Sequence, residues 1–165
     1  MKIGVTAVHG ASLEIARGEF VTITGRSGSG KTTLLNLAAG LTRPTAGRVL
    51  WEGQDLWRLG DRQRSRLRNQ KVGFVFQFPS LLPSLTALEN VSLPAIFNSN
   101  GVREQANERA LELMEVVGLQ DKLYATPRQL SAGQQQRVVV ARALLQNPRV
   151  ILADDRHALG SPRAQ

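Results

Sequence analysis

The sequence contains no cysteine among its 165 residues. Disulfide bonds and metal sites built on thiolates are therefore excluded. It also has no apolar run that approaches the roughly 20 residues of a membrane-spanning helix. Residues 1–9 lack the long apolar core of a signal peptide. We therefore expect a cytosolic protein and, at this length, one domain with a hydrophobic core of its own.

Acidic residues are few relative to basic ones. The sequence has 13 Asp and Glu but 21 Lys and Arg, and its formal net charge is +8. A positive surface can attract nucleic acid or anionic lipid. Five of the arginines gather in one stretch, at Arg58, Arg62, Arg64, Arg66 and Arg68. No aromatic residue interleaves with them, which argues against a groove for single-stranded nucleic acid. The stretch is expected to be a solvated helical face.

Residues 25–33 match the phosphate-binding template G-x-x-x-x-G-K-[ST] at every fixed position. The β-branched and aromatic run 19–24 before them predicts a buried strand. Residues 34–39 after them favour a helix, closed by Gly40 in the C′ position. Strand, glycine loop and helix are the arrangement that this motif requires. The candidate nucleotide-binding residues are Gly25, Arg26, Ser27, Gly28, Ser29, Gly30, Lys31, Thr32 and Thr33.

Each part of this motif has a chemical role. The glycines let backbone N–H groups turn toward phosphate oxygens, and the helix N-terminus adds its dipole. Lys31 is expected to reach the outer phosphates, Thr32 to ligate Mg²⁺, and Thr33 to lie nearer the α-phosphate. The alternative is a glycine-rich turn before an ordinary helix, which the flanking elements disfavour.

Further helices and strands are predicted from the spacing of apolar residues and from residues that begin or end helices. Ser131 and Gln134 have the spacing of a capping box, which starts a helix that continues to Leu145. An amphipathic helix is expected at 102–117, with Leu111, Met114 and Val117 on its apolar stripe and Gly118 at its end. Further strands are predicted at 11–16, 48–51, 71–76 and 149–154, a polar helix at 61–69, and helical pieces around 85–91.

Asp154 ends the apolar run 150–153. In an open parallel sheet, ligands bind at the carboxyl ends of the strands. Asp154 is therefore expected to point at the Mg²⁺ held by Thr32, which is the usual arrangement in phosphate-loop proteins.

The run 130–137, Leu-Ser-Ala-Gly-Gln-Gln-Gln-Arg, together with Gln77 between the two phosphate motifs, resembles the ATP-binding subunit of an ABC transporter. Residues 76–91 are similar to the branch that serves lipoprotein release and macrolide export. The resemblance implies an α/β fold with a P-loop NTPase core on a parallel sheet, at about 1–79 and 146–155. A helical subdomain at about 80–145 completes this single partial domain, and 156–165 form a divergent tail.

The resemblance also implies a mechanism and partners. Two subunits pair head to tail, and each ATP lies between one glycine loop and residues 131–134 of the other subunit, namely Ser131, Ala132, Gly133 and Gln134. Gln77 would sense Mg²⁺ and the attacking water, so the Mg²⁺ contacts would be Thr32, Gln77 and Asp154. Residues 78–91 would contact transmembrane permease subunits on the inner face of the cell membrane, and no nucleic acid is expected.

The sequence departs from this family in three places, and it reads as truncated at both ends. No aromatic residue precedes Phe20 to stack on adenine, so weak ATP binding is expected. Asp155 stands where the family has glutamate, which draws the catalytic carboxylate back by on the order of 1 Å. The tail after Asp155, with His157 in it, does not continue the family's pattern, and a strand between 19–24 and 150–154 is missing.

These departures predict ATP hydrolysis at background level. They leave open a non-catalytic nucleotide-binding fragment as the alternative function. A nucleic-acid-dependent ATPase is a third candidate, motivated by the net charge and disfavoured by Gln77 and residues 130–137. The sequence does not indicate the transported substrate or the direction of transport.

Overall fold

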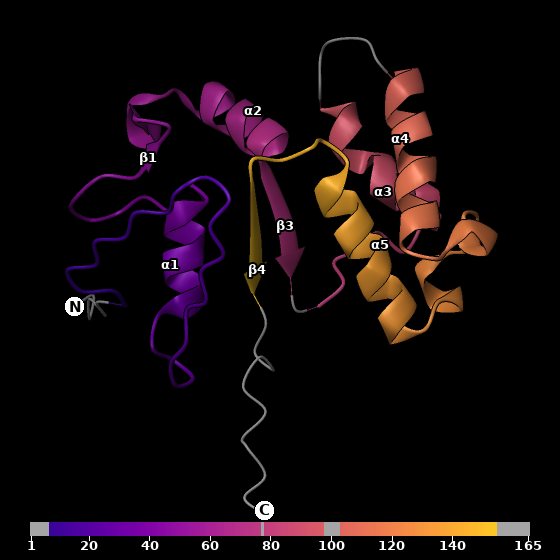
Figure 1. The fold of residues 1–165 in the computed structure, drawn as a ribbon, viewed down its shortest axis with the longest axis horizontal. Coiled ribbons are helices and arrows are strands. Elements are labelled where there is room, and N and C mark those ends of the chain that lie inside the picture. Colours follow the sequence, from indigo (N-terminus) through magenta and orange to yellow (C-terminus); the bar gives the residue numbers. More distant parts are fainter. Residues whose placement is uncertain (1–6, 77, 98–102, 155–165) are drawn as a thin grey trace, which may run out of the picture. The chain divides into compact units, whose positions relative to one another are not determined.

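The computed structural model describes residues 7–76, 78–97 and 103–154 (Figure 1). The chain forms two compact units, Met1–Leu59 and Gly60–Gln165, and each is described by itself below. The first unit carries the glycine loop, and the second carries a parallel strand pair with its helices. The division into a core and a helical subdomain at 80–145 stays a prediction.

Helix α1 (Lys31–Ala38) follows the glycine loop, as the sequence predicts. Gly40 follows the C-cap residue Ala39, and its φ of +64° places it in the left-handed region. The Gly40 N–H donates to the Leu37 carbonyl and the Leu41 N–H to the Asn36 carbonyl, each at 2.9 Å. These two bonds form a Schellman motif, which confirms Gly40 as the C′ residue.

After α1, the first unit forms a small hairpin. Strands β1 (Leu50–Trp51) and β2 (Gln54–Asp55) pair in antiparallel fashion. The two residues that join them, Glu52 and Gly53, both have positive φ, which suits the twist of a two-residue hairpin turn. A 3₁₀ turn, η1 (Leu56–Arg58), follows. The strand expected at 48–51 is therefore present in its second half.

The strands predicted at 11–16 and 19–24 are wrong, because the structure assigns neither as a strand. The turn between them is present, since Gly18 has a φ of +80° and the Glu19 N–H donates to the Ala16 carbonyl at 3.2 Å. Apolar side chains along the segment are exposed, and Phe20 reaches 92%. A strand exists only when its backbone pairs with a neighbour, and among residues 7–76, 78–97 and 103–154 no strand pairs with either run.

The second unit is built on two parallel strands. Helix α2 (Asp61–Lys71) runs directly into β3 (Val72–Phe76), and β4 (Val150–Asp154) lies beside it. The register pairs Val72 with Val150 at one end and Phe76 with Asp154 at the other. The predictions for 61–69, 71–76 and 149–154 are confirmed within two residues at each end.

Three helices pack together on one side of this strand pair (Figure 1). They are α3 (Ala87–Ile96), α4 (Arg103–Val116) and α5 (Ala132–Leu144), with 3₁₀ turns η2 (Gln120–Lys122) and η3 (Pro127–Gln129) between the last two. Helix α5 contacts α3, α4 and β3, so it is the central element of the unit. Its Val138, Val139 and Ala141 are fully buried and belong to the main hydrophobic core.

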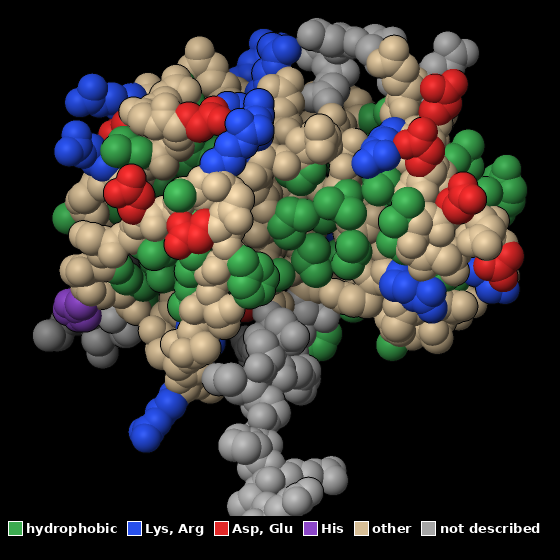
Figure 2. Space-filling view, in the orientation of Figure 1, with side chains coloured by type: hydrophobic (Ala, Val, Ile, Leu, Met, Phe, Trp, Pro, Cys, Tyr) green, Lys and Arg blue, Asp and Glu red, His purple; other side chains and the backbone are tan. Residues whose placement is uncertain are grey.

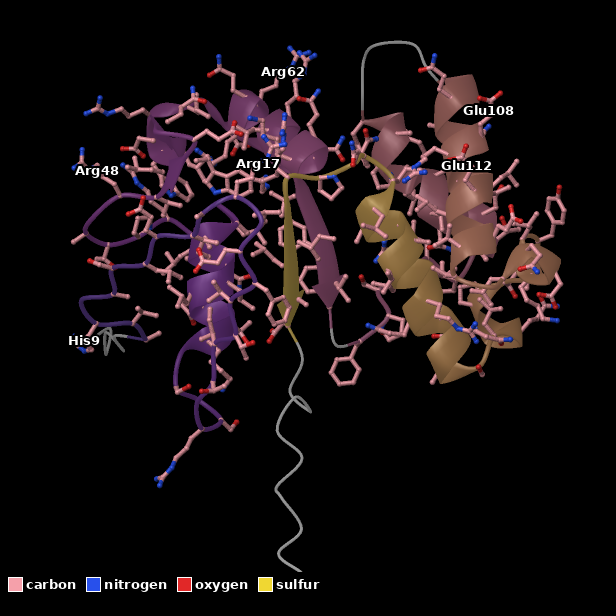
Figure 3. All side chains as sticks on the ribbon, in the orientation of Figure 1. His9, Arg17, Arg48, Arg62, Glu108 and Glu112 are labelled. Atoms are coloured by element: carbon pink, nitrogen blue, oxygen red, sulfur yellow. The ribbon has the colours of Figure 1, made fainter. Side chains whose placement is uncertain are left out.

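The apolar stripe of α4 differs from the predicted one. Leu111 is 42% exposed, whereas Ala110, Leu113 and Met114 are buried and Val117 is half-buried against the same core. The buried positions follow the i, i+3, i+4, i+7 spacing of a helix face, and the choice of Leu111 departed from it by one residue. Glu108, Arg109 and Glu112 are exposed, as expected. Figure 3 shows the two glutamates on the outer side of α4.

Gly73 lies where the backbones of β3 and α5 come close together. A β-carbon added there would lie 2.5 Å from the Ala143 carbonyl oxygen and 3.1 Å from Cγ of Pro148. Because the first of these atoms is backbone, Gly73→Ala is expected to reduce the free energy of unfolding by about 1–3 kcal/mol. Urea unfolding followed by circular dichroism measures this. The matched control is Gly133→Ala, since a β-carbon there meets nothing within 4 Å; an equal loss in both variants would contradict the packing argument.

Candidate functional site

The glycine loop takes its shape from backbone conformations that favour glycine. Gly28 and Gly30 have φ of +80° and +91°, and Gly30 is the N-cap of α1. A β-carbon on Gly30 would collide with the Ala7 carbonyl oxygen, so only glycine fits there. Inside the loop, the Ser29 N–H donates to the Arg26 carbonyl at 3.1 Å and forms a tight turn. The loop is therefore a backbone turn that leads straight into a helix.

Lys31 lies across this turn. Its ammonium donates to the carbonyl oxygens of Gly25 at 2.8 Å and Arg26 at 2.9 Å, and to Oγ of Ser29 at 3.4 Å. The positive charge is thus held at the loop rather than extended into solvent. An ammonium in this position can exchange these neutral acceptors for phosphate oxygens, which form stronger charge-assisted bonds.

The N-terminus of α1 adds to the positive potential of the loop. The first N–H groups of a helix have no acceptor within the helix, and the helix dipole places a partial positive charge there. The first turn contains no acidic side chain, and Gly25 through Ser29 are exposed. The first unit thus presents an accessible loop with a lysine and two threonines, Thr32 and Thr33, whose backbone and charge are suited to an anion.

The second unit brings together the ends of β3 and β4. Because the strands are parallel and Phe76 pairs with Asp154, both carboxyl ends reach the same edge. Gln77 follows Phe76 in the sequence and Asp155 follows Asp154. Gln77 and Asp155 themselves lie outside the described residues. Thr32 and Asp154 belong to different units, so their shared Mg²⁺ contact stays a prediction.

The N-terminus of α5 has the predicted capping box. The Gln134 N–H donates to Oγ of Ser131 at 3.3 Å, and the Ser131 N–H donates to Oε1 of Gln134 at 2.8 Å. Ser131, Ala132 and Gly133 are exposed. Within the part of the chain that the structure describes, nothing requires glycine at 133, because a β-carbon there meets no atom within 4 Å. This helix end is accessible to an anion from outside the chain.

The sequence did not indicate the contacts of two polar side chains of α5, Gln136 and Arg142, although Gln136 lies within the run 130–137. Gln136 contacts the last residue of β3, and Arg142 contacts Ser80. Their partners are 60 and 62 residues away along the chain. Short-range sequence patterns cannot predict contacts between residues so far apart in the chain. The one sequence signal is that each is a polar residue on a helix whose neighbouring residues are largely apolar.

The arginine-rich helix α2 is only partly the solvated face that was expected. Arg62 and Arg66 are exposed, and Figure 3 shows Arg62 extending outward from α2. In Figure 2 basic side chains gather over this helix. The Arg64 side chain, in contrast, is 13% exposed and bonds to Asp61 at 2.7 Å. Arg68 is half-buried, and burial, followed by repulsion from Arg64, lowers its pKa. The prediction of a fully solvated face is therefore wrong for two of the five arginines.

We expect this cluster not to be a nucleic-acid site. With Arg64 and Arg68 turned inward, few charges remain for phosphate contacts, and each lost contact reduces both affinity and its salt dependence. A salt-titrated binding assay with single- and double-stranded DNA checks this. Sub-micromolar affinity at physiological salt that disappears when Arg58, Arg62 and Arg66 are changed to glutamine would reverse the conclusion.

Among the described residues, none of the helices combines the length and apolar character needed to cross a membrane. In the same part of the chain, no three His, Cys, Asp or Glu side chains gather in a way that could hold a metal ion. A Mg²⁺ bound with a nucleotide does not need such a cluster, because phosphates and water supply most of its ligands.

A family model and related proteins both indicate the same family for this chain. A family model described as "ABC transporter" matches residues 8–158. The chain is 50% identical over 150 residues to the lipoprotein-releasing system ATP-binding protein LolD 1 of Chlorobium chlorochromatii, covering 91% of the chain and 61% of that protein. It is 48% identical over 155 residues to the macrolide export ATP-binding/permease protein MacB of Syntrophobacter fumaroxidans, covering 93% and 22%.

The solved structures agree. A dimeric ATP-binding cassette, MJ0796, in a post-hydrolysis state bound to ADP and Pi superposes with a TM-score of 0.83 at 45% identity, covering 93% of this chain and 68% of that one. The α/β fold of a P-loop NTPase core with additional helices is therefore confirmed. The chain spans less than two thirds of the length of the curated relatives it matches.

Proposed function

Because the chain belongs to the ABC transporter family, we propose that it is the nucleotide-binding part of an ATP-binding subunit that powers transport across a membrane. The observation that carries this proposal is the glycine loop, in which Lys31 lies over the carbonyls of Gly25 and Arg26 at the start of α1. A glycine loop, a lysine and the N-terminus of a helix are the parts that hold a nucleoside triphosphate in this motif. The similarity to the ATP-binding protein LolD 1 and the ATP-binding/permease protein MacB supports the transport role.

The residues present fit ATP. Residues 25–33 would surround the phosphates, with backbone N–H groups on their oxygens and Lys31 on the outer ones. Glycine is needed at Gly30, since a β-carbon there would meet the backbone of Ala7. Loss of this glycine would distort the loop.

The residues also fit Mg²⁺. The Thr32 hydroxyl, the Asp154 carboxylate and the Gln77 amide are hard oxygen donors, which this ion prefers. When bound, Mg²⁺ neutralises negative charge on the phosphate oxygens. Asp154 ends β4 at the edge where ligands bind in parallel sheets. These three residues would orient the outer phosphates for attack by water.

Hydrolysis depends on Asp155, which would hold the attacking water with help from Gln77. The carboxylate of aspartate reaches less far than the glutamate of the family, so ATP hydrolysis by this chain is expected at background level. The second candidate, a nucleotide-binding protein without turnover, is favoured by this same residue. Phosphate release from ATP separates the two: release by the unmodified chain above background that Lys31→Ala abolishes identifies a hydrolase, whereas release only by Asp155→Glu identifies a nucleotide-binding chain that residue 155 keeps from turnover.

The exposed start of α5 supports a site shared by two copies. Ser131 and the N–H groups near Gly133 would face the γ-phosphate bound in the glycine loop of a second subunit. The related cassette MJ0796 is a dimer in its ADP-bound structure. We therefore propose head-to-tail pairing in which ATP lies between the subunits.

Contact with permease subunits would involve residues 78–91 and the surface beside them. A groove of about 710 Å³ lies in the second unit, with Phe76, Ser80, Pro94 and Phe97 in its walls. Arginines of α2 and α5 also line it, so it combines apolar and positive surface. This surface suits a partner segment, and it would place the protein at the inner face of the cell membrane.

Titration with ATP in the presence and absence of Mg²⁺ tests the proposed function. Saturable binding that Mg²⁺ strengthens, with weaker binding of AMP, is expected, because the loop recognises the outer phosphates. Calorimetry or a fluorescent ATP analogue measures it. Equal affinity for ATP and AMP would contradict phosphate recognition by the loop.

A further inference from the structure

Two polar side chains of α5, Gln135 and Arg137, bond to segments that precede the helix in the chain. Nε2 of Gln135 donates to the carbonyl oxygens of Pro127 at 2.7 Å and Leu130 at 3.2 Å. Nη1 of Arg137 donates to the Val117 carbonyl oxygen at 3.0 Å. All of these residues belong to the second unit. The first half of α5 is therefore attached at two places to the chain that leads into it.

The bonds of Gln135 hold the turn from which α5 starts. Pro127 begins η3 and is buried, and Leu130 is the residue before the N-cap Ser131. The Leu130 N–H donates to the Pro127 carbonyl at 3.2 Å, so one side-chain amide bonds to both ends of this turn. A change in the shape of the turn would move Ser131, and Gln135 opposes such a change.

The bond of Arg137 connects α5 to the end of α4. Val117 directly follows α4, and Gly118 after it has a φ of +67°. A guanidinium is favourable here, because the last carbonyls of a helix have no donor within the helix and carry a partial negative charge. Residues 135 and 137 are two positions apart, which places them about 200° from each other around a helix. The two attachments therefore hold α5 from nearly opposite sides.

The start of α5 is exposed, so polar bonds have a larger part in holding it than apolar packing does. Residues 131–133 are exposed, and full burial of the helix begins only at Val138. The N–H groups of Ala132 and Gly133 belong to the first turn and have no acceptor within the helix. Their direction is the direction of this first turn, which the two side-chain attachments fix.

We propose that Gln135 and Arg137 are positioning residues: they aim the exposed start of α5 at the nucleotide of a second copy. This inference rests on the proposed function, because it presumes that this helix end contacts ATP across a dimer. The bonds of both side chains go to protein carbonyls, so both residues act through the helix backbone. Misplacing a positioned group by about 1 Å can cost as much as about a hundredfold. A role in stability alone would leave the dimerisation of the folded protein unchanged.

The experiment measures dimerisation of the full chain with Mg-ATP by sedimentation velocity. ATP affinity below the dimerisation concentration and thermal unfolding without nucleotide are measured beside it. Gln135→Met and Arg137→Met remove the bonds and keep an unbranched side chain. Each is expected to weaken dimerisation about tenfold and to leave the ATP affinity of the single chain unchanged, because the glycine loop is intact. Gln135→Met changes no charge, so weaker attraction to ATP cannot explain a loss in this variant.

Two further variants complete the design. Arg137→Lys keeps the charge and one donor, so it should retain most of the dimerisation, and it serves as a second variant if Arg137→Met fails to fold. Arg109→Met is the matched control, because Arg109 is an exposed residue of α4 that bonds to Glu112 of the same helix at 2.8 Å. This change removes an exposed arginine and its bond outside α5, and the variant should dimerise as the unmodified chain does.

The outcomes separate this inference from the proposed function. Unchanged dimerisation of folded Gln135→Met and Arg137→Met overturns the positioning role and leaves the proposed function standing. An equal loss in Arg109→Met, or a loss in Arg137→Lys as large as that in Arg137→Met, does the same. ATP binding by the unmodified chain without dimerisation overturns the shared site and this inference, and leaves nucleotide binding standing. Absence of ATP binding by the unmodified chain overturns the proposed function and this inference together.

Discussion

Replacing Lys31 by alanine is expected to abolish the stabilisation of this protein by Mg-ATP. The ammonium lies within 3 Å of two loop carbonyls, Gly25 and Arg26, where it can transfer to phosphate oxygens. Hydrogen bonds to charged groups contribute about 1.5–3 kcal/mol each, so ATP affinity should fall at least about tenfold. Thermal unfolding at increasing Mg-ATP concentration measures the change.

The control for this variant is Lys122→Ala, which removes a lysine from the second unit outside the proposed site. It should retain the full nucleotide-dependent shift in melting temperature. Unfolding without nucleotide must also be compared, because Lys31 itself closes the loop through three hydrogen bonds. Equal stabilisation of Lys31→Ala and the unmodified protein by ATP would place the nucleotide somewhere else.

Replacing Gly133 by aspartate is expected to prevent ATP-dependent dimerisation while the single chain stays folded and still binds ATP. Space is available, since a β-carbon at 133 meets no atom within 4 Å. A carboxylate in the first turn of α5 is favourable for the helix itself. In the proposed dimer, however, this carboxylate would face the γ-phosphate of the ATP that is bound to the second subunit. The repulsion between the two negative groups costs several kcal/mol.

Sedimentation velocity with Mg-ATP reports this effect directly. Gly133→Ala is the matched control, because it adds the β-carbon without the charge and should still dimerise. If Gly133→Asp dimerises as readily as Gly133→Ala, the start of α5 does not face the nucleotide of another copy.

Local sequence rules predicted the elements that carry their own signals. Gly40 and Gly118 end helices in the left-handed conformation, and Ser131 with Gln134 forms the capping box, as spacing alone indicates. The apolar runs at 72–76 and 150–154 form the parallel pair. Each of these features depends on residues a few positions apart, or on a strand that finds its partner within the described chain.

Features that depend on distant neighbours could not be predicted in this way. The runs 11–16 and 19–24 have strand composition but no paired neighbour among the residues that the structure describes, and Phe20 is exposed instead of buried. Leu111 has the chemistry of a core residue, yet the face of α4 that packs is set by the helices around it. The bonds of Gln136 and Arg142 join segments about 60 residues apart, which no local pattern encodes.

The proposed composite nucleotide site is tested most directly by mixing the two variants described above. Lys31→Ala damages the glycine loop and leaves Ser131 and Gly133 intact, whereas Gly133→Asp does the reverse. Neither variant alone should dimerise with Mg-ATP. A mixture contains one intact site, made from the loop of the Gly133→Asp chain and the α5 end of the Lys31→Ala chain, so sedimentation velocity should show a heterodimer with one bound ATP. A mixture that stays monomeric at nucleotide concentrations where the unmodified chain dimerises would contradict the shared site.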